Sequence, residues 1–335
     1  MKHVDSRGEE LAIKPFFASI QECLFPIDLL SLTLNPVWNW SSHPDDTPET
    51  LALKWKVLGQ NIAITSASSW VWHCGQGPTV LCLHGVPCSS FGYRRLLPAL
   101  AAAGLHAVAL DFPGMGWADR LQEYFDYSWS GLASWLLHAL DALNLYNLHL
   151  LAHDTSGPIV FELLRLCPER IASVSFMSCM FATASYRRPW FMQPLAWKNI
   201  GPLYLGHFKP SWFSRLYRRA AIFAPMPDNE ILTHWHLMTH QDQGKAFLAI
   251  MRGFEYAKVF EQRARTTLQG SPIPMQILWG HHDKALPPNR FIHDAIRMLN
   301  RNDVHYFEAG HSVQEDSPEA LANQMKSFIL RSSTS

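Results

Sequence analysis

The sequence predicts an α/β fold in which a mostly parallel central sheet is flanked by helices on both faces. Short apolar segments of strand length alternate with longer amphipathic segments between residues 79 and 180, and the alternation resumes between 269 and 335. Strands that alternate with helices form parallel sheets, because each crossover places a helix against a face of the sheet. Residues 181–268 lack a buried-strand pattern, so we expect a helical cap inserted after the sixth strand.

The first strands of the predicted sheet precede this alternation. Residues 51–74 alternate between apolar and polar types and are rich in β-formers, with turn residues at 59–61 and 66–69, which predicts two antiparallel strands. The alternating part then gives strands at 79–84, 106–110, 148–153 and 171–177, with helices at 93–103, 128–144 and 159–166. Inside the insertion we expect helices at 228–241 and 244–265, and beyond it strands at 275–279 and 304–307 with helices at 289–298 and 318–330.

The amino-acid composition indicates which kinds of molecule the protein could bind. The 335 residues include 28 Lys and Arg and 28 Asp and Glu, so the formal net charge is zero and nothing points to nucleic acid as a partner. The 13 Trp, 19 Phe and 11 Met side chains are enough to fill a core and also to line an apolar pocket.

The six cysteines and the N-terminal region bear on the compartment. No pair of cysteines has CxxC spacing, and the first ten residues lack an apolar segment typical of a signal peptide. We therefore expect reduced thiols in a cytoplasmic protein. Residues 1–50 predict an N-terminal extension of short helices and a loop that packs on the core; a homodimer contact or a weak membrane-surface contact through them are the alternatives.

The segment 148–166 predicts a strand, a sharp turn and a helix, which is the context of a nucleophile elbow. Such a turn needs small residues two positions before and two after the reactive side chain. Ala152 and Ser156 meet this requirement only if Asp154 is the reactive residue, whereas centring the elbow on Ser156 would put Asp154 and Pro158 at the small positions. Asp154 is thus a candidate carboxylate nucleophile; the alternative is an ordinary N-cap Asp.

Two more titratable residues follow predicted strands. Asp283 comes after the strand 275–279, and His311 comes after the strand 304–307. Nucleophile, acid and histidine in this order are the chain order of an α/β-hydrolase triad. The individual alternatives are a loop acid for Asp283 and a structural histidine for His311.

The motifs carry a family resemblance. His84-Gly85-Val86-Pro87 matches the HGxP loop, and Asp111 to Gly116 matches the DxPGxG loop. With the triad, they resemble the α/β-hydrolase superfamily, in the aspartate-nucleophile branch that contains epoxide hydrolases and haloalkane dehalogenases. The resemblance covers about 52–330. It implies an α/β-hydrolase core at 51–180 and 269–335, a cap at 181–268, and an extension at 1–50 outside the resemblance.

This resemblance implies hydrolysis in two steps. A carboxylate is ionised at neutral pH, so Asp154 would attack a saturated carbon directly and form an alkyl ester. His311 would then take a proton from the water that attacks this ester, and Asp283 would orient His311. Backbone N–H groups of Val86 and Thr155 would form the oxyanion hole.

The leaving group decides the subclass. Dehalogenases resemble one another in a Trp directly after the nucleophile, usually with Asn in the HGxP loop or a second Trp, but this sequence has Thr155 and Val86 there. Epoxide hydrolases also usually have that Trp, so Thr155 departs from both patterns. Epoxide hydrolases use two cap tyrosines as acids. The cap candidates for stabilising the leaving group are Tyr186, Tyr204, Tyr217, Tyr256, Trp190 and Trp212.

We therefore expect a hydrolase that opens an apolar, small epoxide with water. A haloalkane dehalogenase-like hydrolase is the alternative, and a lyase, an oxygenase or a ligand-binding receptor on the same scaffold are further ones.

No cofactor or metal is expected. His236 and His240 have the spacing of metal ligands, but no Cys or acid is in register as a third ligand. Cys88 lies beside the HGxP loop and has no assigned base, so we interpret it as a small buried residue.

Overall fold

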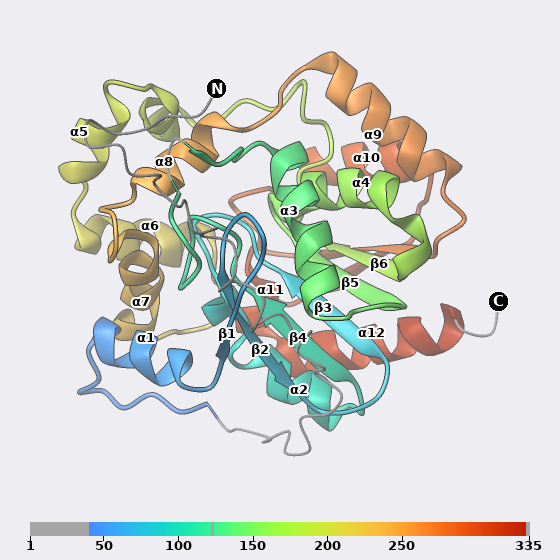
Figure 1. Ribbon diagram of the computed structural model, residues 1–335, viewed down its shortest axis with the longest axis horizontal. Coiled ribbons are helices and arrows are strands. Elements are labelled where there is room, and N and C mark those ends of the chain that lie inside the picture. The colour runs from blue at the N-terminus through green and yellow to red at the C-terminus, as the bar shows by residue number, and fades with distance from the viewer. Residues whose placement is uncertain (1–39, 122–123, 333–335) are drawn as a thin grey trace, which may run out of the picture.

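The computed structural model describes residues 40–121 and 124–332, and its centre is one eight-stranded sheet (Figure 1). The strand order is β1-β2-β4-β3-β5-β6-β7-β8. The strands are β1 (Gln60–Ile62), β2 (Ser69–Cys74), β3 (Thr79–Leu83), β4 (His106–Leu110), β5 (Leu148–His153), β6 (Ile171–Met177), β7 (Met275–Gly280) and β8 (Val304–Phe307).

The sheet is mostly parallel, as predicted. Only β1 with β2 and β2 with β4 pair antiparallel, and the other five neighbouring pairs are parallel. All residues of β4, β5 and β7 are buried, because helices cover both faces of the sheet. Parallel strands end at the same edge, so the loops after β3, β5, β7 and β8 meet there.

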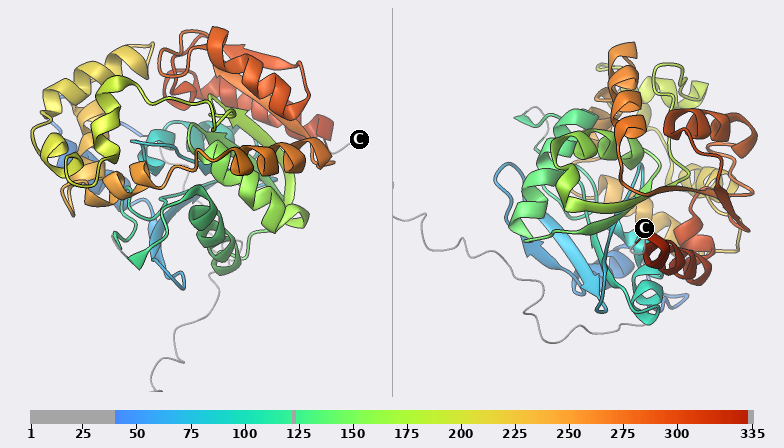
Figure 2. Two further views of the ribbon diagram at one scale, coloured as in Figure 1. Left: turned by 90° about the horizontal axis from the view of Figure 1, so that it is seen from above. Right: turned by 90° about the vertical axis from the view of Figure 1, so that its right-hand side faces the viewer.

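Helices form a layer on each side of the sheet (Figures 1 and 2). One face carries a buried apolar cluster under α2 (Leu96–Ala102) and α12 (Pro318–Ser332), which contact each other. The other face is covered by α3 (Trp129–Ala142), α4 (Ser156–Leu166) and α10 (Pro288–Leu299) over a larger cluster. Three short elements complete the connections: η1 (Ser90–Tyr93), η3 (Pro168–Arg170) and α11 (Val313–Asp316).

The segment between β6 and β7 is helical, and no strand occurs in it. It contains η4 (Trp190–Ala196), α5 (Gly201–Gly206), α6 (Pro210–Ala220), α7 (Asp228–Thr239), α8 (Lys245–Arg252) and α9 (Lys258–Gly270). Helices α5 to α8 gather at one end of the sheet, whereas α9 crosses back and packs on α4 and α10 (Figures 1 and 2).

Two expectations about local structure were wrong. Residues 244–265 were expected to form one helix but belong to two, α8 and α9. The chain between them packs on the loop before α3 at Gly253, where a Cβ would lie 2.3 Å from the Tyr127 carbonyl oxygen. Residues 51–56 belong to helix α1 (Pro48–Lys56) rather than to a strand. The Thr47 side chain accepts a hydrogen bond from the Thr50 N–H and Pro48 occupies the first turn, which starts a helix there.

Part of the predicted N-terminal extension, residues 1–39, lies outside the described residues. Within the described ranges, no helix combines the length and apolarity needed to cross a membrane.

Candidate active site

Asp154 lies in the turn between β5 and α4 with a φ of +57°. This left-handed conformation is unfavourable for a residue with a Cβ, and it occurs where the surrounding structure enforces it. The neighbouring chain leaves little room: a Cβ on Gly85 would lie 2.4 Å from the Asp154 Cβ and Oδ1 atoms. The turn therefore presents the Asp154 carboxylate at the carboxyl edge of the sheet.

Ser156, the other candidate for the elbow, is fully buried and its hydroxyl is occupied. Its Oγ atom accepts a hydrogen bond from the His153 N–H at 2.7 Å and lies 2.8 Å from the carbonyl oxygens of Leu83 and His153, to which it donates. These bonds tie the elbow to the end of β3. They hold the turn and leave Ser156 without access to a substrate.

His311 lies between the two predicted carboxylates. Its Nε2 atom is 3.4 Å from Asp154 Oδ2, and its Nδ1 atom is 2.9 Å from Asp283 Oδ2. The other Asp283 oxygen accepts the Leu286 N–H at 2.7 Å, which fixes the carboxylate. The structure thus brings the three predicted triad residues together from the ends of β5, β7 and β8.

Electrostatics couple these groups. Burial alone would lower the pKa of His311, but the charge of Asp283 and the hydrogen bonds to Asp154 and Asp283 outweigh it and raise the pKa to about 10. Burial would raise the pKa of Asp154, but the hydrogen bond and charge of His311 outweigh it, so that pKa is lowered. The free site therefore holds an imidazolium between two carboxylates.

The predicted oxyanion-hole residues adjoin Asp154. The Val86 N–H donates to Asp154 Oδ1 at 3.2 Å, and a hydrogen bond from the Thr155 backbone helps to lower the Asp154 pKa. His84 holds the loop, because its Nε2 atom accepts the Phe112 N–H at 3.0 Å and its Nδ1 atom lies 2.9 Å from the Gly85 oxygen. Oδ1 thus accepts a backbone N–H, whereas Oδ2 faces His311.

A cavity of about 590 Å³ opens in front of Asp154, under the helices of the insertion. Its wall is mainly apolar, with side chains such as Met180, Phe191, Phe208, Phe247 and Phe254. A cavity of this size and character suits a small apolar molecule.

The cap candidates divide into two groups. Tyr186, Tyr204 and Tyr217 line the cavity. Tyr256, Trp190 and Trp212 are not among its lining residues: Trp190 is 83% and Trp212 50% exposed, and Tyr256 stacks behind Tyr186 with ring centroids 6.1 Å apart. The structure therefore does not bring these three to the reacting groups.

The three cavity tyrosines differ in the partners of their hydroxyls. Tyr204 donates to the Phe191 carbonyl at 2.8 Å, and the Tyr217 hydroxyl lies 3.5 Å from Cys88 Sγ and 3.4 Å from Ser312 Oγ. Burial, followed by the charge of Asp154, raises the pKa of Tyr186, so this phenol stays protonated in the cavity that Asp154 also lines.

Sequence reasoning missed His153, which precedes Asp154 and also lines the cavity. Its Nε2 atom lies 3.0 Å from the His311 carbonyl oxygen, and the Gln314 amide is 3.5 Å from its Nδ1. Burial lowers the pKa of His153 to about 3, so the ring is neutral and ties the elbow to the His311 loop. Its position as the last residue of an apolar strand gave no signal of this role.

His236 and His240 lie apart from the cavity, whereas Cys88 lines it. His236 and His240 stack on each other at 5.2 Å, and the described residues contain no group of three or more His, Cys, Asp or Glu that could hold a metal. Burial raises the pKa of Cys88 to about 12, so this thiol is protonated. The five cysteines within the described ranges are free and buried.

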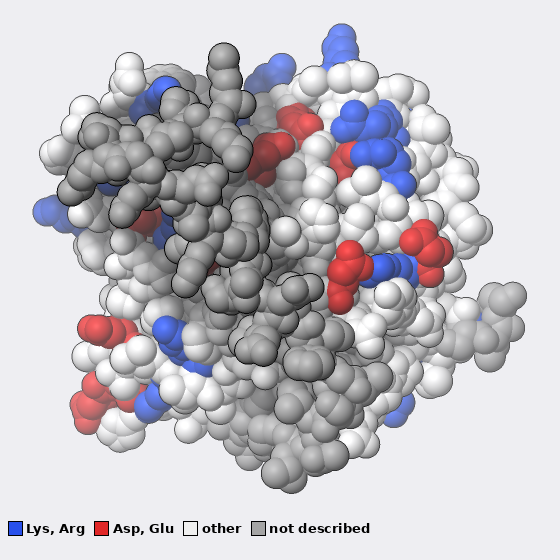
Figure 3. Space-filling view, viewed as in Figure 1, with Lys and Arg blue, Asp and Glu red and all other residues white. Residues whose placement is uncertain are grey.

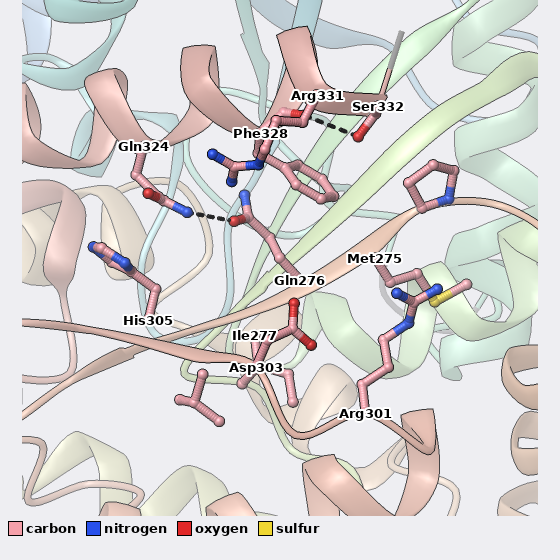
Figure 4. Close-up of a pocket in the computed structure, with 12 residues that line it drawn as sticks. Met275, Gln276, Ile277, Arg301, Asp303, His305, Gln324, Phe328, Arg331 and Ser332 are labelled. Atoms are coloured by element: carbon pink, nitrogen blue, oxygen red, sulfur yellow. Dashed lines mark hydrogen bonds between the residues drawn. The ribbon is translucent and has the colours of Figure 1, made fainter. Parts of the chain in front are cut away.

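A second pocket of about 350 Å³ lies at the opposite edge of the sheet, where β7 and β8 begin beside α12 (Figure 4). There the Gln324 side chain donates to Gln276 at 2.8 Å. None of the predicted site residues lines this pocket.

The sequence is similar to a protein family and to several known enzymes. The family described as alpha/beta hydrolase fold matches residues 78–318. A haloalkane dehalogenase of Psychrobacter cryohalolentis is 26% identical over 77% of this chain and 87% of its own length. A bifunctional epoxide hydrolase 2 of Sus scrofa is 34% identical, over 43% of this chain and 24% of that protein.

Solved structures share the fold. The haloalkane dehalogenase DatA of Agrobacterium tumefaciens C58 superposes with a TM-score of 0.66 at 18% identity, over 82% of this chain and 96% of DatA. A putative lipase of Acinetobacter baumannii AYE gives a TM-score of 0.70 at 19% identity, over 88% of this chain and 99% of the lipase.

Proposed function

This chain belongs to the α/β hydrolase fold family, and we propose that it is a hydrolase of the epoxide hydrolase and haloalkane dehalogenase type that uses Asp154 as its nucleophile. The observation that supports the nucleophile is the position of its carboxylate. Oδ1 accepts the Val86 N–H, while Oδ2 faces His311 and the apolar cavity.

In the first step, Asp154 Oδ2 attacks a saturated carbon of the substrate. A carbon–oxygen bond forms to the enzyme, and the bond to the leaving group breaks with its electron pair. The product of this step is an alkyl ester that carries no charge on Asp154.

Loss of that charge prepares the second step. His311 is held protonated by two carboxylates, and the ester removes one of them, which lowers the His311 pKa toward neutrality. The imidazolium of His311 releases its proton to solvent once the ester has formed. The neutral His311 then takes a proton from the attacking water, and the hydroxide adds to the carboxyl carbon of the ester. The oxyanion that forms is stabilised by the backbone N–H groups of Val86 and Thr155, and its collapse releases the alcohol and regenerates Asp154.

The leaving group we favour is the alkoxide of an opened epoxide. Tyr186 supports this choice, because a protonated phenol in the same cavity as Asp154 can donate a proton to the ring oxygen as the carbon–oxygen bond breaks. The phenolate that remains is reprotonated from solvent before the next turnover. The apolar wall of the cavity favours an apolar epoxide.

Haloalkane dehalogenation is the second candidate, since the Psychrobacter relative that aligns with most of this chain is a haloalkane dehalogenase. A halide leaving group needs N–H donors. The side chains of Val86 and Thr155 provide none, so Trp235, which lines the cavity, would have to act as one.

Trapping the intermediate tests both candidates. His311→Ala removes the base of the second step, so the ester on Asp154 should accumulate. The variant is incubated separately with apolar epoxides, haloalkanes and activated esters, and the peptide containing Asp154 is analysed by mass spectrometry. A hydroxyalkyl adduct supports epoxide opening, and a plain alkyl adduct supports dehalogenation.

The double variant Asp154→Asn, His311→Ala is the control and should remain unmodified. An acyl group on Ser156 or Cys88 would contradict the proposed nucleophile. Wild-type turnover without any adduct on Asp154 in the trapping variant would contradict it as well.

A further inference from the structure

The first half of the insertion has an uneven charge. Residues 181–227 contain seven Lys and Arg and no Asp or Glu, although the whole chain has 28 of each sign. Positive and negative residues are interspersed elsewhere, as on the part of the described surface visible in Figure 3. Arg188 and Arg219 line the cavity and Arg218 pairs with Asp228, and the other four cations are exposed: Arg187, Lys198, Lys209 and Arg215. A surface with charges of one sign favours an anionic partner.

Large apolar side chains are exposed in the same stretch. Trp190 is 83%, Leu203 66% and Trp212 50% exposed, and Trp197 and Ile200 are also exposed. We call the exposed side chains of residues 187–215 the basic aromatic surface. Lys198, Lys209 and Arg215 lie within it, and the Lys209 ammonium is 5.9 Å from the Trp212 ring.

Contacts between η4, α5 and α6 show that the elements of this surface pack on one another. Trp190 is in ring contact with Phe191 in η4, whose carbonyl accepts the hydroxyl of Tyr204 in α5. Phe208 then links Tyr204 to Trp212 at the start of α6, with centroid distances of 6.2 and 6.1 Å. The exposed aromatic residues thus belong to one packed unit.

The inner side of this unit is the wall of the cavity. Phe191, Tyr204 and Phe208 line the cavity, whereas their neighbours Trp190, Leu203 and Trp212 are exposed. In α6 the positions alternate in the same way, since Phe213 and Tyr217 line the cavity and Trp212 and Arg215 face outward. One layer of side chains therefore separates the exposed surface from the cavity.

We propose that the basic aromatic surface docks on a bilayer that contains anionic lipids. Trp side chains favour the interface between water and lipid, and nearby Lys and Arg are attracted to anionic headgroups. Docking would place the cavity wall against the bilayer, where apolar molecules partition. The delivery of substrate from lipid depends on the proposed function, but the docking itself does not.

Flotation of the full-length protein with lipid vesicles tests the proposal without any turnover. Vesicles of phosphatidylcholine alone are compared with vesicles in which a third of the lipid is phosphatidylglycerol. We expect binding to the anionic vesicles that weakens with added salt. Lys198→Glu with Lys209→Glu should lower the partition coefficient at least tenfold, since each Lys near the surface contributes about 1 kcal/mol.

Leu203→Ser should lower the partition coefficient severalfold, because it removes an exposed apolar side chain from the docking face. Two matched controls lie elsewhere: Lys326→Glu on α12 and Val259→Ser on α9, whose Val is 70% exposed. They should bind as the wild type does. Unchanged thermal unfolding shows that each variant is folded.

Absence of vesicle binding would overturn the proposal, and so would binding that the cap variants and the controls reduce equally. Self-association that the cap variants abolish, without vesicle binding, would assign the surface to a second copy of the chain instead. If no adduct forms on Asp154 in the trapping experiment, the vesicle-binding result still stands. The proposed function and the proposed membrane docking can therefore fail independently.

Discussion

The imidazole of His311 faces the carboxylate of Asp154, with Nε2 3.4 Å from Oδ2, inside a buried site. This pair is an acid and a base that hold each other in the charged form. The proposed nucleophile is therefore ionised before substrate arrives, and in the proposed mechanism His311 acts as a base only after Asp154 has lost its charge.

The charged pair predicts how stability depends on pH. The His311 pKa is raised from 6.5 to about 10 by folding, so its contribution is fully present below pH 6.5 and is lost as the pH rises toward 10. The free energy of unfolding should fall across this window by up to about 1.4 kcal/mol per pH unit. Urea unfolding at a series of pH values measures the slope. The His311→Gln variant should lack this slope. If the free energy of unfolding depends on pH in the same way in both proteins, the prediction of a charged His311–Asp154 pair is contradicted.

Ser156 gives a prediction that separates support of the elbow from chemistry. Ser156→Ala removes one hydroxyl that serves a buried N–H and two carbonyls, so it should destabilise the fold by about 1–3 kcal/mol. Turnover should persist, since Asp154 is intact. Urea unfolding and steady-state kinetics measure the two effects, with Asp154→Asn as the inactive reference. Complete inactivity of a folded Ser156→Ala protein would argue for Ser156 as the nucleophile.

Tyr186 tests the choice of epoxide over halide. Tyr186→Phe removes the proton donor and keeps the ring, so kcat on an epoxide should fall about 10²–10⁴-fold with a small change in KM. Tyr204→Phe is the matched control, because the Tyr204 hydroxyl is already bound to the Phe191 carbonyl. Hydrolysis of haloalkanes should be insensitive to Tyr186→Phe. Equal losses for both variants would show that Tyr186 acts through packing alone.

Local sequence patterns were sufficient for the core of the fold. Apolar runs such as 148–153, followed by turn residues and a helical period, specify a buried parallel strand and its helix, which the structure confirms. The small residues Ala152 and Ser156 also favoured Asp154 over Ser156 at the elbow. Helix α1 was missed because its start depends on the Thr47 cap, which precedes the alternating pattern.

Local sequence patterns could not predict which cap side chains line the cavity. Trp190 and Phe191 are neighbours of similar character, yet one is exposed and the other lines the cavity, in a short 3₁₀ segment that contains Pro194 and has no helical period. Which face is inward depends on packing between elements. The buried pair of Arg94 and Glu315 likewise joins residues 221 positions apart, so no local signal announces it.

That pair belongs to a charged cluster between the insertion and the core. The Arg94 guanidinium is fully buried between Glu230 of α7 and Glu315 of α11, and its contact with Glu315 Oε1 is 2.6 Å. Burial would raise the Glu315 pKa, but the charge of Arg94 and the hydrogen bond of His234 outweigh it and lower the pKa from 4.5 to about 2. The stabilisation of the fold by the ionised Glu315 is present above pH 4.5 and is lost as the pH falls toward 2.

Arg94→Met should therefore destabilise the protein by about 3–5 kcal/mol, because it leaves two carboxylates buried without their main counter-charge. Arg95→Met is the matched control. Arg95 contacts the same two carboxylates, but its side chain is 31% exposed, so its loss should cost about 1 kcal/mol or less. Urea unfolding at pH 7 measures both. If Arg94→Met and Arg95→Met lower the free energy of unfolding equally, then the burial of Arg94 does not explain how the cluster stabilises α7 against the core.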